Sequence, residues 1–389
     1  MNRPLRLLVV AGEVSGDMLA APVVSAIRDQ VALMECYGIG GERLRAAGVE
    51  TLYDVQDMAV VGLTEALRRL WFFRRVMADV LAAARARPPD AALLVDYPGF
   101  NLRLAARLHR RGIRVIYYVC PQVWAWHRSR IPLMARSVNR LIVLFRFETD
   151  VFAGTGLRVD FAGHPLVDEV RRTLAEPTAT LPWQGRPRVA LLPGSRPQEI
   201  DRLLPVFRQA ARLMEQYQPT VSFLVATPSA AVTALVRRRL AGLGPGPARM
   251  EIVEGRTRQV VRQADAALVA SGTATLETAM LDCPMVIAYQ TTALTYRAAR
   301  RLIRIRHVGL PNIVAGRTIC PEFIQGAAQP EALAGALLPL LEDTPARRRM
   351  LAGYEEVRAA LGPGDASTRA AGSVMAELGL PLSQIPTAR

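Results

Sequence analysis

Acidic and hydroxyl side chains follow the first apolar run of the chain. Gly12-Glu13-Val14-Ser15-Gly16-Asp17 comes directly after Leu5–Val10 and reads as a buried strand, a small-residue turn and the start of a helix. Such a turn directs backbone N–H groups and the positive end of the helix dipole toward a ligand. We therefore expect Glu13, Ser15, Gly16 and Asp17 to lie at a substrate site, with helix capping as the structural alternative for Asp17.

A carboxylate at the end of a second strand is the candidate general base. Asp96 follows the apolar run Ala91–Val95, and the turn Pro98–Asn101 then leads into a helix. Ligands of open α/β sheets gather at the carboxyl edge of the strands. There, Asp96 could accept the proton of a hydroxyl nucleophile. An N-cap or turn aspartate is the structural alternative, and Glu13 or Asp17 is the next candidate base.

Two loops in the second half of the chain favour an anionic ligand. One places Gly194, Ser195 and Arg196 after Val189–Leu192, where turn amides and a guanidinium could clamp a diphosphate. The other places Ser271, Gly272, Thr273 and Glu277 after Ala266–Val269. Its hydroxyls and its glycine could approach a phosphate, and Glu277 could accept hydrogen bonds from ribose hydroxyls. A first-turn acid that answers the helix dipole is the alternative for Glu277.

Several kinds of chemistry are excluded or not demanded. The chain contains no lysine, so all 49 basic residues are arginine and no Schiff base or phosphate-loop lysine can form. The four cysteines are scattered and are expected to be buried small hydrophobes. No H-E-x-x-H motif or Cys/His cluster calls for a metal, and no cofactor is expected. His164 is expected to be a structural turn residue.

Composition points to an anionic partner. The formal charge of the 389 residues is +15, which suits a phosphorylated substrate or an acidic membrane surface. The arginines are dispersed and form no recognisable nucleic-acid module, so nucleic acid is discounted. No apolar run reaches the roughly 18 residues of a membrane span, and no signal-peptide pattern opens the chain. A cytoplasmic protein, free or peripheral on a membrane, is expected.

The apolar runs alternate with helical stretches in both halves of the chain, which predicts two α/β domains with parallel sheets. We expect a first domain over residues 1–180, a second over 181–345, and a helical tail over 346–389 that packs back on the first domain. The two domains should face each other across a cleft. The strands are expected at Leu5–Val10, Ala91–Val95, Val115–Val119, Leu141–Phe145, Val159–Ala162, Val189–Leu192, Phe223–Ala226, Glu251–Val253, Ala266–Val269 and Met285–Ala288.

The segment Met58–Val80 has apolar residues on more than one side of a predicted helix. Leu63, Leu67, Leu70 and Met77 share one face, whereas Phe72 and Val76 fall on the opposite side beside arginines. Exposed aromatic residues next to arginine suit a membrane interface. An ordinary core helix with a solvated arginine edge is the alternative.

Read together, the ordered motifs resemble one family. AGEVSGD, DMAVVGLTEAL, VDYPGFN, PQVWAW, GHPLVD, LLPGSR, ASGTATLE and LPNIVAG closely resemble lipid-A-disaccharide synthases from about Leu5 to about Leu341. The resemblance implies a GT-B glycosyltransferase fold and an inverting transfer. UDP-2,3-diacylglucosamine would react with 2,3-diacylglucosamine 1-phosphate (lipid X), giving the β-1,6-linked lipid A disaccharide 1-phosphate and UDP. It also implies work at the cytoplasmic face of the inner membrane of Gram-negative bacteria.

The resemblance assigns roles to individual residues. Asp96 matches the suspected base, Ser15 matches the serine of the first loop, and Asn101 keeps its place in the turn. Tyr97 and Gly99 stand where some members have Ala and Asp. The UDP-site positions matched are Arg196, Ser271, Glu277 and Asn312. The acyl or membrane surface falls between Val60 and Phe73, with the candidate contacts Val60, Val61, Leu67, Leu70, Trp71, Phe72 and Phe73.

Other functions stay open at this point. Another UDP-sugar enzyme of the same fold, a 2-epimerase or a peptidoglycan glycosyltransferase, is the nearest alternative, but an epimerase needs no lipid-facing helix. A nicotinamide-dependent oxidoreductase would require the G-x-G-x-x-G spacing that Gly12 and Gly16 lack. A non-catalytic peripheral membrane protein is the third alternative function. The oligomeric state, including a homodimer, and the acyl chain length are also open.

Overall fold

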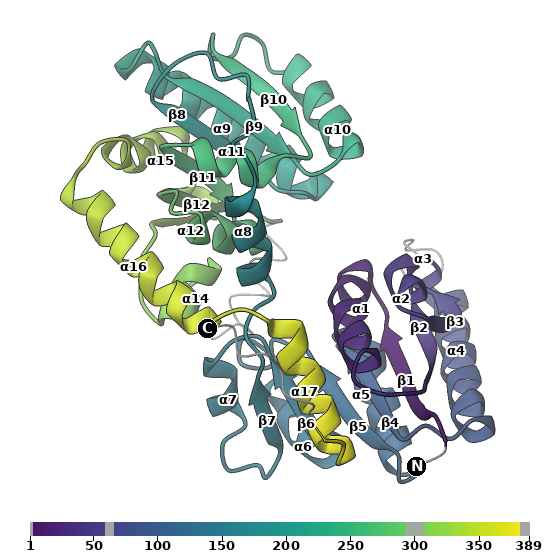
Figure 1. The fold of residues 1–389 in the computed structure, drawn as a ribbon. Coiled ribbons are helices and arrows are strands. Elements are labelled where there is room, and N and C mark those ends of the chain that lie inside the picture. The colour runs from purple at the N-terminus through teal and green to yellow at the C-terminus, as the bar shows by residue number, and fades with distance from the viewer. Residues whose placement is uncertain (1–2, 59–65, 293–295, 297–305, 382–389) are drawn as a thin grey trace. The chain divides into compact units, whose positions relative to one another are not determined.

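The structure, a computed structural model, describes residues 3–58, 66–292, 296 and 306–381 (Figure 1). The chain divides into two compact units. Unit 1 comprises Met1–Pro165 and Leu361–Arg389, and unit 2 comprises Leu166–Ala360. The predicted boundaries after residues 180 and 345 differ from these. The first lies earlier because α8 (Leu166–Ala175) packs against α11 (Thr257–Gln263) and α12 (Thr273–Met280) of unit 2.

Unit 1 is built on a seven-stranded sheet in the order β3-β2-β1-β4-β5-β6-β7, with parallel neighbours throughout. The strand order reverses at β1, which lies between β2 and β4, and such a reversal is where open α/β sheets bind ligands. Ala11 of β1 pairs with Val95 of β4, so the loops that begin at Gly12 and Asp96 leave the sheet side by side. The strands are β1 (Leu5–Ala11), β2 (Met34–Gly40), β3 (Val49–Asp54), β4 (Ala91–Val95), β5 (Arg114–Tyr118), β6 (Arg140–Val143) and β7 (Arg158–Phe161).

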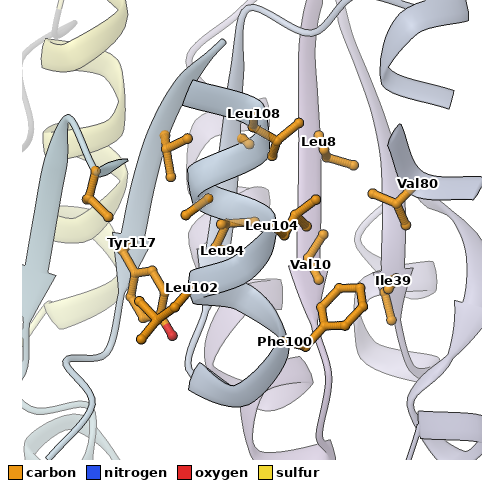
Figure 2. Packing of buried hydrophobic residues seen from close by; sticks show 14 of the residues in the cluster. Leu8, Val10, Ile39, Val80, Leu94, Phe100, Leu102, Leu104, Leu108 and Tyr117 are labelled. Atoms are coloured by element: carbon orange, nitrogen blue, oxygen red, sulfur yellow. The ribbon is translucent and has the colours of Figure 1, made fainter. Parts of the chain in front are cut away.

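Helices cover both faces of this sheet, which is why its central strands are apolar beyond their first residues. Alternate residues of β1 enter different cores: Leu8 and Val10 face α4 and α5, and Leu7 and Val9 face α1 and α17. Figure 2 shows the first of these cores, where strand side chains meet α5. The helices are α1 (Val14–Arg28), α2 (Glu42–Ala46), α3 (Val55–Met58), α4 (Ala66–Ala86), α5 (Pro98–His109), α6 (Ile131–Ser137), α7 (Phe147–Val151) and α17 (Ala366–Leu378).

The buried face of α4 differs from the predicted one. Val76 and Val80 are fully buried against the sheet, and Phe72 is half-buried beside Tyr53. The prediction that Phe72 and Val76 lie on the outward side was therefore wrong. Residues four apart share a helix face, so burial of Val80 brings Val76 and then Phe72 inward with it.

Unit 2 repeats the arrangement with a six-stranded parallel sheet in the order β10-β9-β8-β11-β12-β13. The strand order reverses at β8, which lies between β9 and β11. The strands are β8 (Arg188–Leu192), β9 (Ser222–Thr227), β10 (Met250–Glu254), β11 (Ala266–Ala270), β12 (Met285–Tyr289) and β13 (Glu322–Ile324). The remaining helices are α9 (Pro197–Tyr217), α10 (Ala230–Ala241), α14 (Leu310–Ala315), α15 (Pro330–Leu337) and α16 (Pro345–Leu361).

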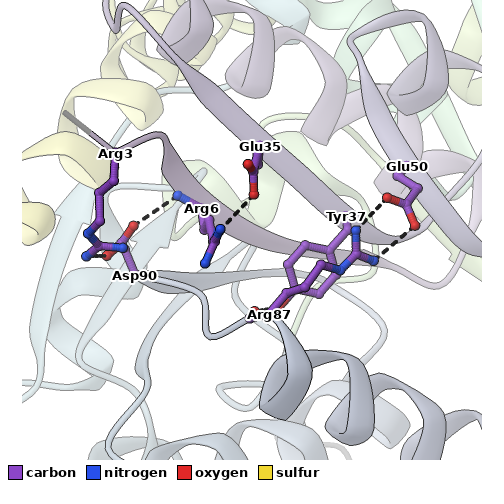
Figure 3. Close-up of polar contacts among 7 residues, drawn as sticks. All are labelled: Arg3, Arg6, Glu35, Tyr37, Glu50, Arg87 and Asp90. Atoms are coloured by element: carbon purple, nitrogen blue, oxygen red, sulfur yellow. Dashed lines mark hydrogen bonds and ion pairs between the residues drawn. The ribbon is translucent and has the colours of Figure 1, made fainter.

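Arginines stabilise the edge of the first sheet at which its strands begin (Figure 3). Arg6, at the start of β1, donates to Glu35 of β2 at 2.8 Å. Arg87, just after α4, makes two hydrogen bonds with Glu50 of β3, at 2.6 and 3.0 Å, and its guanidinium lies over the ring of Tyr37. These charged contacts lie at the edge where the strands begin. The loops that carry the candidate site lie at the opposite edge, where the strands end.

The predicted α/β fold with two parallel sheets is confirmed, and each predicted strand is present within one or two residues. Strands β2, β3 and β13 were not predicted. In β2, Gly38 has a φ of +152°, and a Cβ there would lie 1.8 Å from the carbonyl oxygen of Val9. The close approach of β1 thus requires a glycine at this position of β2. All four cysteines are free and buried. Among the described residues, no helix is both long and apolar enough to cross a bilayer.

Candidate active site

Two strand ends of unit 2 form one pocket. β8 ends at Leu192 and β11 at Ala270, and these neighbouring strands send Gly194–Arg196 and Ser271–Gly272 out at the same edge. The loops enclose a pocket of about 300 Å³. All the predicted nucleotide-site residues except Asn312 line it: Gly194, Ser195, Arg196, Ser271, Gly272, Thr273 and Glu277.

The first of these loops is held by an internal carboxylate. Glu199, in the first turn of α9, accepts from the backbone N–H groups of Ser195 and Arg196 at 3.4 Å and pairs with the Arg196 guanidinium at 3.0 Å. Gly194 has a φ of +112°, and a Cβ there would lie 2.7 Å from Glu199. The Arg196 side chain is 81% exposed, so its pair with Glu199 is weak. A bound diphosphate could therefore replace Glu199 as the partner of the Arg196 guanidinium.

The second loop presents the start of α12 to the same pocket. Gly272 is the N-cap residue and makes no side-chain cap, so no side chain of its own competes for the first-turn amides. Ser271 donates its hydroxyl to the carbonyl of Val308 at 2.7 Å, which fixes the loop to the segment before α14. This helix start supplies backbone donors and a positive dipole end for an anion.

Glu277 is held by an arginine that sequence reasoning missed. Arg258 of α11 donates to Glu277 at 2.8 and 3.2 Å and also pairs with Glu169 of α8. Burial opposes the charge on Arg258, but the two carboxylates outweigh it and raise the pKa of the guanidinium above its ordinary value. The pair fixes the side chain of Glu277 at the wall of the pocket, where its second oxygen can still accept hydrogen bonds.

Asn312 lies behind the pocket rather than in its lining. Its fully buried amide donates to the carbonyl of Cys320 and to Glu322, and its oxygen accepts from the backbone N–H groups of Ile319 and Cys320. Glu322 in turn accepts from the backbone N–H of Val308, whose carbonyl holds Ser271. The structure therefore gives Asn312 a supporting position, linked to Ser271 of the pocket loop through Glu322 and Val308.

In unit 1, Asp96 occupies a tight turn at the end of β4. Both Asp96 and Tyr97 have left-handed backbones, with φ of 47° and 49°. The carbonyl of Asp96 accepts from the Tyr117 hydroxyl at 2.6 Å and from the Asn101 amide at 2.8 Å. A strained backbone that is held by several neighbours is typical of functional sites. The ring of Tyr97 lies against Gly12, where a Cβ would come within 2.2 Å of it.

The surroundings of Asp96 favour a proton acceptor. Burial raises the pKa of its carboxyl, the negative charge of Glu13 raises it further, and a backbone hydrogen bond from Tyr97 opposes both. A general base works best with a pKa close to the operating pH. Ser15 is exposed, and Gly16 is buried where a Cβ would lie 3.6 Å from the carbonyl oxygen of Val95.

Asp17 and Asn101 serve the fold. The buried carboxylate of Asp17 accepts from the backbone N–H groups of Gly41, Arg43 and Leu44, so it caps α2. The amide of Asn101 donates to the carbonyls of Val10, Val95 and Asp96 and thus joins the ends of β1 and β4. Of the acids in the first loop, Glu13 is the one whose charge acts on Asp96.

Glu148 is a buried acid in α7, a few residues after the end of β6. The sequence analysis did not select it. Its carboxylate accepts from the indole of Trp124 at 3.1 Å and from the backbone N–H of Phe145 at 3.2 Å. Burial raises its pKa to about 7, and these bonds limit the rise. His164 is half-buried beside the ring of Phe145. Desolvation lowers its pKa to about 4, so the imidazole is neutral near pH 7.

An apolar pocket of about 630 Å³ begins at the Asp96 turn. Tyr97, Gly99 and Phe100 supply one wall, and α4 supplies the other with Leu70, Phe73, Arg74 and Met77. Arg103 and Arg107 of α5 complete the lining. Of the predicted acyl or membrane contacts, Leu70 and Phe73 line this pocket, Trp71 is exposed and Phe72 is half-buried. Leu67 belongs to α4, while Val60 and Val61 lie outside the described residues.

Comparison with known proteins decides the family. The sequence model described as "Lipid-A-disaccharide synthetase" matches residues 7–373. The chain belongs to the lipid-A-disaccharide synthetase family. It is 42% identical over 373 residues to the lipid-A-disaccharide synthase of Anaeromyxobacter sp. (strain K), covering 95% of this chain and 97% of the relative. It is 38% identical over 381 residues to that of Geobacter sulfurreducens, covering 97% and 98%. As a lipid-A-disaccharide synthetase family member it is a glycosyltransferase of lipid A biosynthesis.

Solved structures agree with a GT-B fold for this lipid-A-disaccharide synthetase family member. A UDP-GlcNAc 2-epimerase from Neisseria meningitidis bound to UDP-GlcNAc has a TM-score of 0.63 at 13% identity, covering 96% of this chain and 100% of that one. The calicheamicin glycosyltransferase CalG4 has a TM-score of 0.59 at 17% identity, covering 99% and 100%. These similarities concern the fold. The alternatives of an epimerase and a peptidoglycan glycosyltransferase are not favoured by the family match.

Four pocket residues that the sequence analysis did not indicate lie at or after the carboxyl ends of two strands of unit 2. Ala226 lies at the end of β9 and Pro228 follows it. Thr257 and Arg258 follow β10, at the same edge as the two predicted loops. Applying the strand-end rule to every strand would have found them. The pairing of Arg258 with Glu277 has no such signal, because it depends on how α11 packs beside α12. Within the described residues, no three His, Cys, Asp or Glu side chains group as metal ligands.

Proposed function

We propose that this enzyme transfers 2,3-diacylglucosamine from UDP to the 6-hydroxyl of 2,3-diacylglucosamine 1-phosphate, with inversion at the anomeric carbon. The products are the β-1,6-linked disaccharide 1-phosphate and UDP. The observation that carries the proposal is the apolar pocket that begins at Tyr97, the residue after the candidate base. A base next to a pocket of this character suits a hydroxyl nucleophile that carries acyl chains.

The donor side of the proposal rests on the pocket of unit 2. Arg196 and the start of α12 would bind the diphosphate of the donor, and Glu277 would accept hydrogen bonds from the ribose hydroxyls. Oriented donors of this kind stabilise the charge that develops on a leaving diphosphate. Ser271, Gly272 and Thr273 would bring the backbone close to the same phosphates.

The chemical step follows from these assignments. Asp96 would take the proton of the acceptor 6-hydroxyl as that oxygen forms a bond to the anomeric carbon of the donor. The bond from the anomeric carbon to the β-phosphate oxygen breaks, and UDP leaves with the electron pair. Glu13 would keep the pKa of Asp96 high enough for the carboxylate to be an effective proton acceptor. Since Asp96 belongs to unit 1 and the donor pocket to unit 2, the reaction requires both units.

We also propose that α4 meets the anionic inner-membrane surface. Leu70 and Trp71 are 45% and 67% exposed, and the Arg74 guanidinium lies 5.5 Å from the centre of the Trp71 ring. An aromatic residue beside arginine fits the interface between lipid headgroups and acyl chains. The enzyme would thereby take its lipid substrates from the membrane without crossing it.

The test is a transfer assay with purified enzyme, UDP-2,3-diacylglucosamine and 2,3-diacylglucosamine 1-phosphate in detergent micelles. Mass spectrometry should detect the disaccharide 1-phosphate and an equal amount of UDP. The assay is run with and without EDTA, because the proposed donor site relies on arginine and a helix N-terminus. UDP-N-acetylglucosamine serves as the control donor. Absence of the disaccharide, or formation of an epimer from the control donor, would contradict the proposal.

A further inference from the structure

The lining of the apolar pocket in unit 1 is rich in arginine. Arg74 of α4 and Arg103 and Arg107 of α5 line it together with Leu70, Phe73, Met77 and Phe100. Among the residues that the structure describes, no carboxylate is part of this lining. A pocket that combines apolar walls with guanidinium groups suits a molecule that has both an acyl chain and an anionic group.

These arginines lack acidic partners among the residues that the structure describes. Arg75 pairs with Asp79 and Arg87 pairs with Glu50, but within the described part of the chain no ion pair involves Arg74, Arg103 or Arg107. Arg103 and Arg107 are four residues apart on α5 and therefore neighbours on one face of the helix. Like charges at this spacing destabilise an isolated helix. A bound dianion would relieve that repulsion.

The position of the arginines relative to the candidate base is set by α5. Gly99 lies three residues after Asp96, Arg103 lies one helical turn beyond Gly99, and Arg107 lies one further turn along. At about 1.5 Å per residue, the span from Gly99 to Arg107 is about 12 Å. The pocket thus runs from the Asp96 turn along α5, and one ligand could reach both ends.

Two anionic lipids have suitable chemistry: a phospholipid of the membrane and the phosphorylated acceptor. The continuity of the pocket with Tyr97 and Gly99 favours the acceptor, whose reactive hydroxyl must reach Asp96. A phosphomonoester carries up to two charges and three oxygens, which suits several guanidinium groups at once. A phosphodiester of the bilayer carries one charge.

We propose that Arg74, Arg103 and Arg107 bind the phosphomonoester of the acceptor lipid while its acyl chain lies between α4 and α5. This inference rests on the proposed function and adds the means by which the acceptor is chosen. The phosphate holds the acceptor on α5, so the hydroxyl at the far end of the sugar is presented to Asp96. The donor lipid, whose phosphates belong to UDP, would not be bound in this way.

The experiment compares two acceptors, 2,3-diacylglucosamine 1-phosphate and the same lipid without the phosphate. The variant is the full chain with Arg103→Gln and Arg107→Gln. The matched control carries Arg110→Gln and Arg114→Gln, which remove the same charge at exposed positions outside the pocket. The measurements are kcat and KM for each acceptor, KM for the donor, and binding of each lipid in micelles followed by tryptophan fluorescence.

The unsubstituted enzyme should prefer the phosphorylated acceptor, and the pocket variant should lose that preference. Loss of charged hydrogen bonds should raise KM and the dissociation constant for the phosphorylated lipid by about 10- to 100-fold. The values for the dephosphorylated lipid and for the donor should change by less than about twofold, as should all values of the control. An unchanged ratio between the two lipids in a folded variant would overturn the inference.

Two further outcomes separate the explanations. If the pocket variant binds phosphatidylglycerol vesicles less well but keeps its preference between acceptors, the arginines serve the membrane and the inference is wrong. If the enzyme forms no disaccharide yet binds the phosphorylated lipid through Arg103 and Arg107, the proposed function fails while the binding site stands. If binding is also indifferent to the phosphate, both fail.

Discussion

Asp96 is positioned by bonds to its backbone. The carbonyl accepts from Tyr117 and Asn101, and the amide donates to the carbonyl of Tyr118 at 2.9 Å. These bonds hold a left-handed conformation that an aspartate rarely adopts without support. The carboxylate is thereby directed by the turn, and a side-chain substitution should leave the turn in place.

The replacement Asp96→Asn should lower kcat by about 10²- to 10⁴-fold, since that is the usual contribution of general base catalysis. The amide has the same shape but cannot accept the proton. The dissociation constant for UDP, measured by calorimetry, should be unchanged, because the donor pocket lies in unit 2. Retention of most of kcat would transfer the role of base to Glu13.

The replacement Glu13→Gln should change the pH profile of the reaction. Burial and the charge of Glu13 raise the pKa of Asp96, and Asp96 must be ionised to act as the proposed base. Activity therefore falls as the pH drops through this pKa. Removing the Glu13 charge lowers the pKa, so the acid limb of kcat against pH should move to lower pH. A limb that stays in place would show that the two carboxyl groups do not interact in the working enzyme.

At the scale of elements, Arg258 joins three helices of unit 2. It lies on α11, holds Glu277 of α12 and pairs with Glu169 of α8. Loss of one member of such a network leaves a partly buried charge without its partner, which is costly. The geometry of the proposed donor pocket therefore depends on Arg258, which contacts Glu277 and is not part of the pocket lining.

The replacement Arg258→Gln should weaken UDP binding by about tenfold, the equivalent of one charged hydrogen bond. If Arg258 acts by orienting Glu277, the loss should fall on recognition of the ribose. UDP and 2′-deoxy-UDP should then bind with similar affinity, while the unsubstituted enzyme prefers UDP. Arg239→Gln, which removes an exposed pair with Asp201, is the control. Preserved discrimination in the Arg258 variant would leave Arg258 with a structural role alone.

α4 has a buried face and an exposed face, and substitutions on the two should have different effects. Val80→Ala removes a fully buried side chain and should lower the free energy of unfolding by about 2 kcal/mol. Trp71→Ser changes a side chain that is 67% exposed and should alter stability by less than about 0.5 kcal/mol. It should instead reduce binding to anionic vesicles. Unfolding curves and vesicle sedimentation distinguish the two, and a large loss of stability in Trp71→Ser would place that residue in the core.

At the scale of the whole molecule, α17 completes unit 1 although it comes last in the chain. It packs against α1, and Ala370, Ala371 and Val374 belong to the core on that face of the sheet. Glu377 also pairs with Arg140 of β6 at 3.1 Å. A chain that ends at residue 360 should therefore lose cooperative unfolding of unit 1 while unit 2 stays folded. Hydrogen exchange of the two sheets would measure this, with removal of residues 382–389 as the control. Normal protection of β1 in the shorter chain would contradict it.

The sequence was most informative where strands are buried on both faces. Apolar runs such as Ala91–Val95 admit few other structures, and the small-residue turns after them indicated the pocket loops of unit 2. It was least informative where a role depends on a tertiary contact. The sequence could not show that the Asp17 carboxylate accepts hydrogen bonds from the backbone at the start of α2. Nor could it show that the Asn312 side chain is hydrogen-bonded to Cys320 and Glu322. Periodicity placed Phe72 and Val76 on the wrong side of α4, since it cannot show which face meets the sheet.

The division of unit 1 into two stretches of chain has a consequence for biosynthesis. Unit 2 is one continuous segment, Leu166–Ala360, inserted between the two parts of unit 1. During synthesis on the ribosome, every residue of unit 2 is added to the chain before α17 is made. Synthesis of unit 1 therefore begins before that of unit 2 and ends after it. Until α17 is made, the core on the α1 face of the first sheet is incomplete. Until then the uncovered alanines and valines around α1 are what a nascent-chain chaperone would encounter.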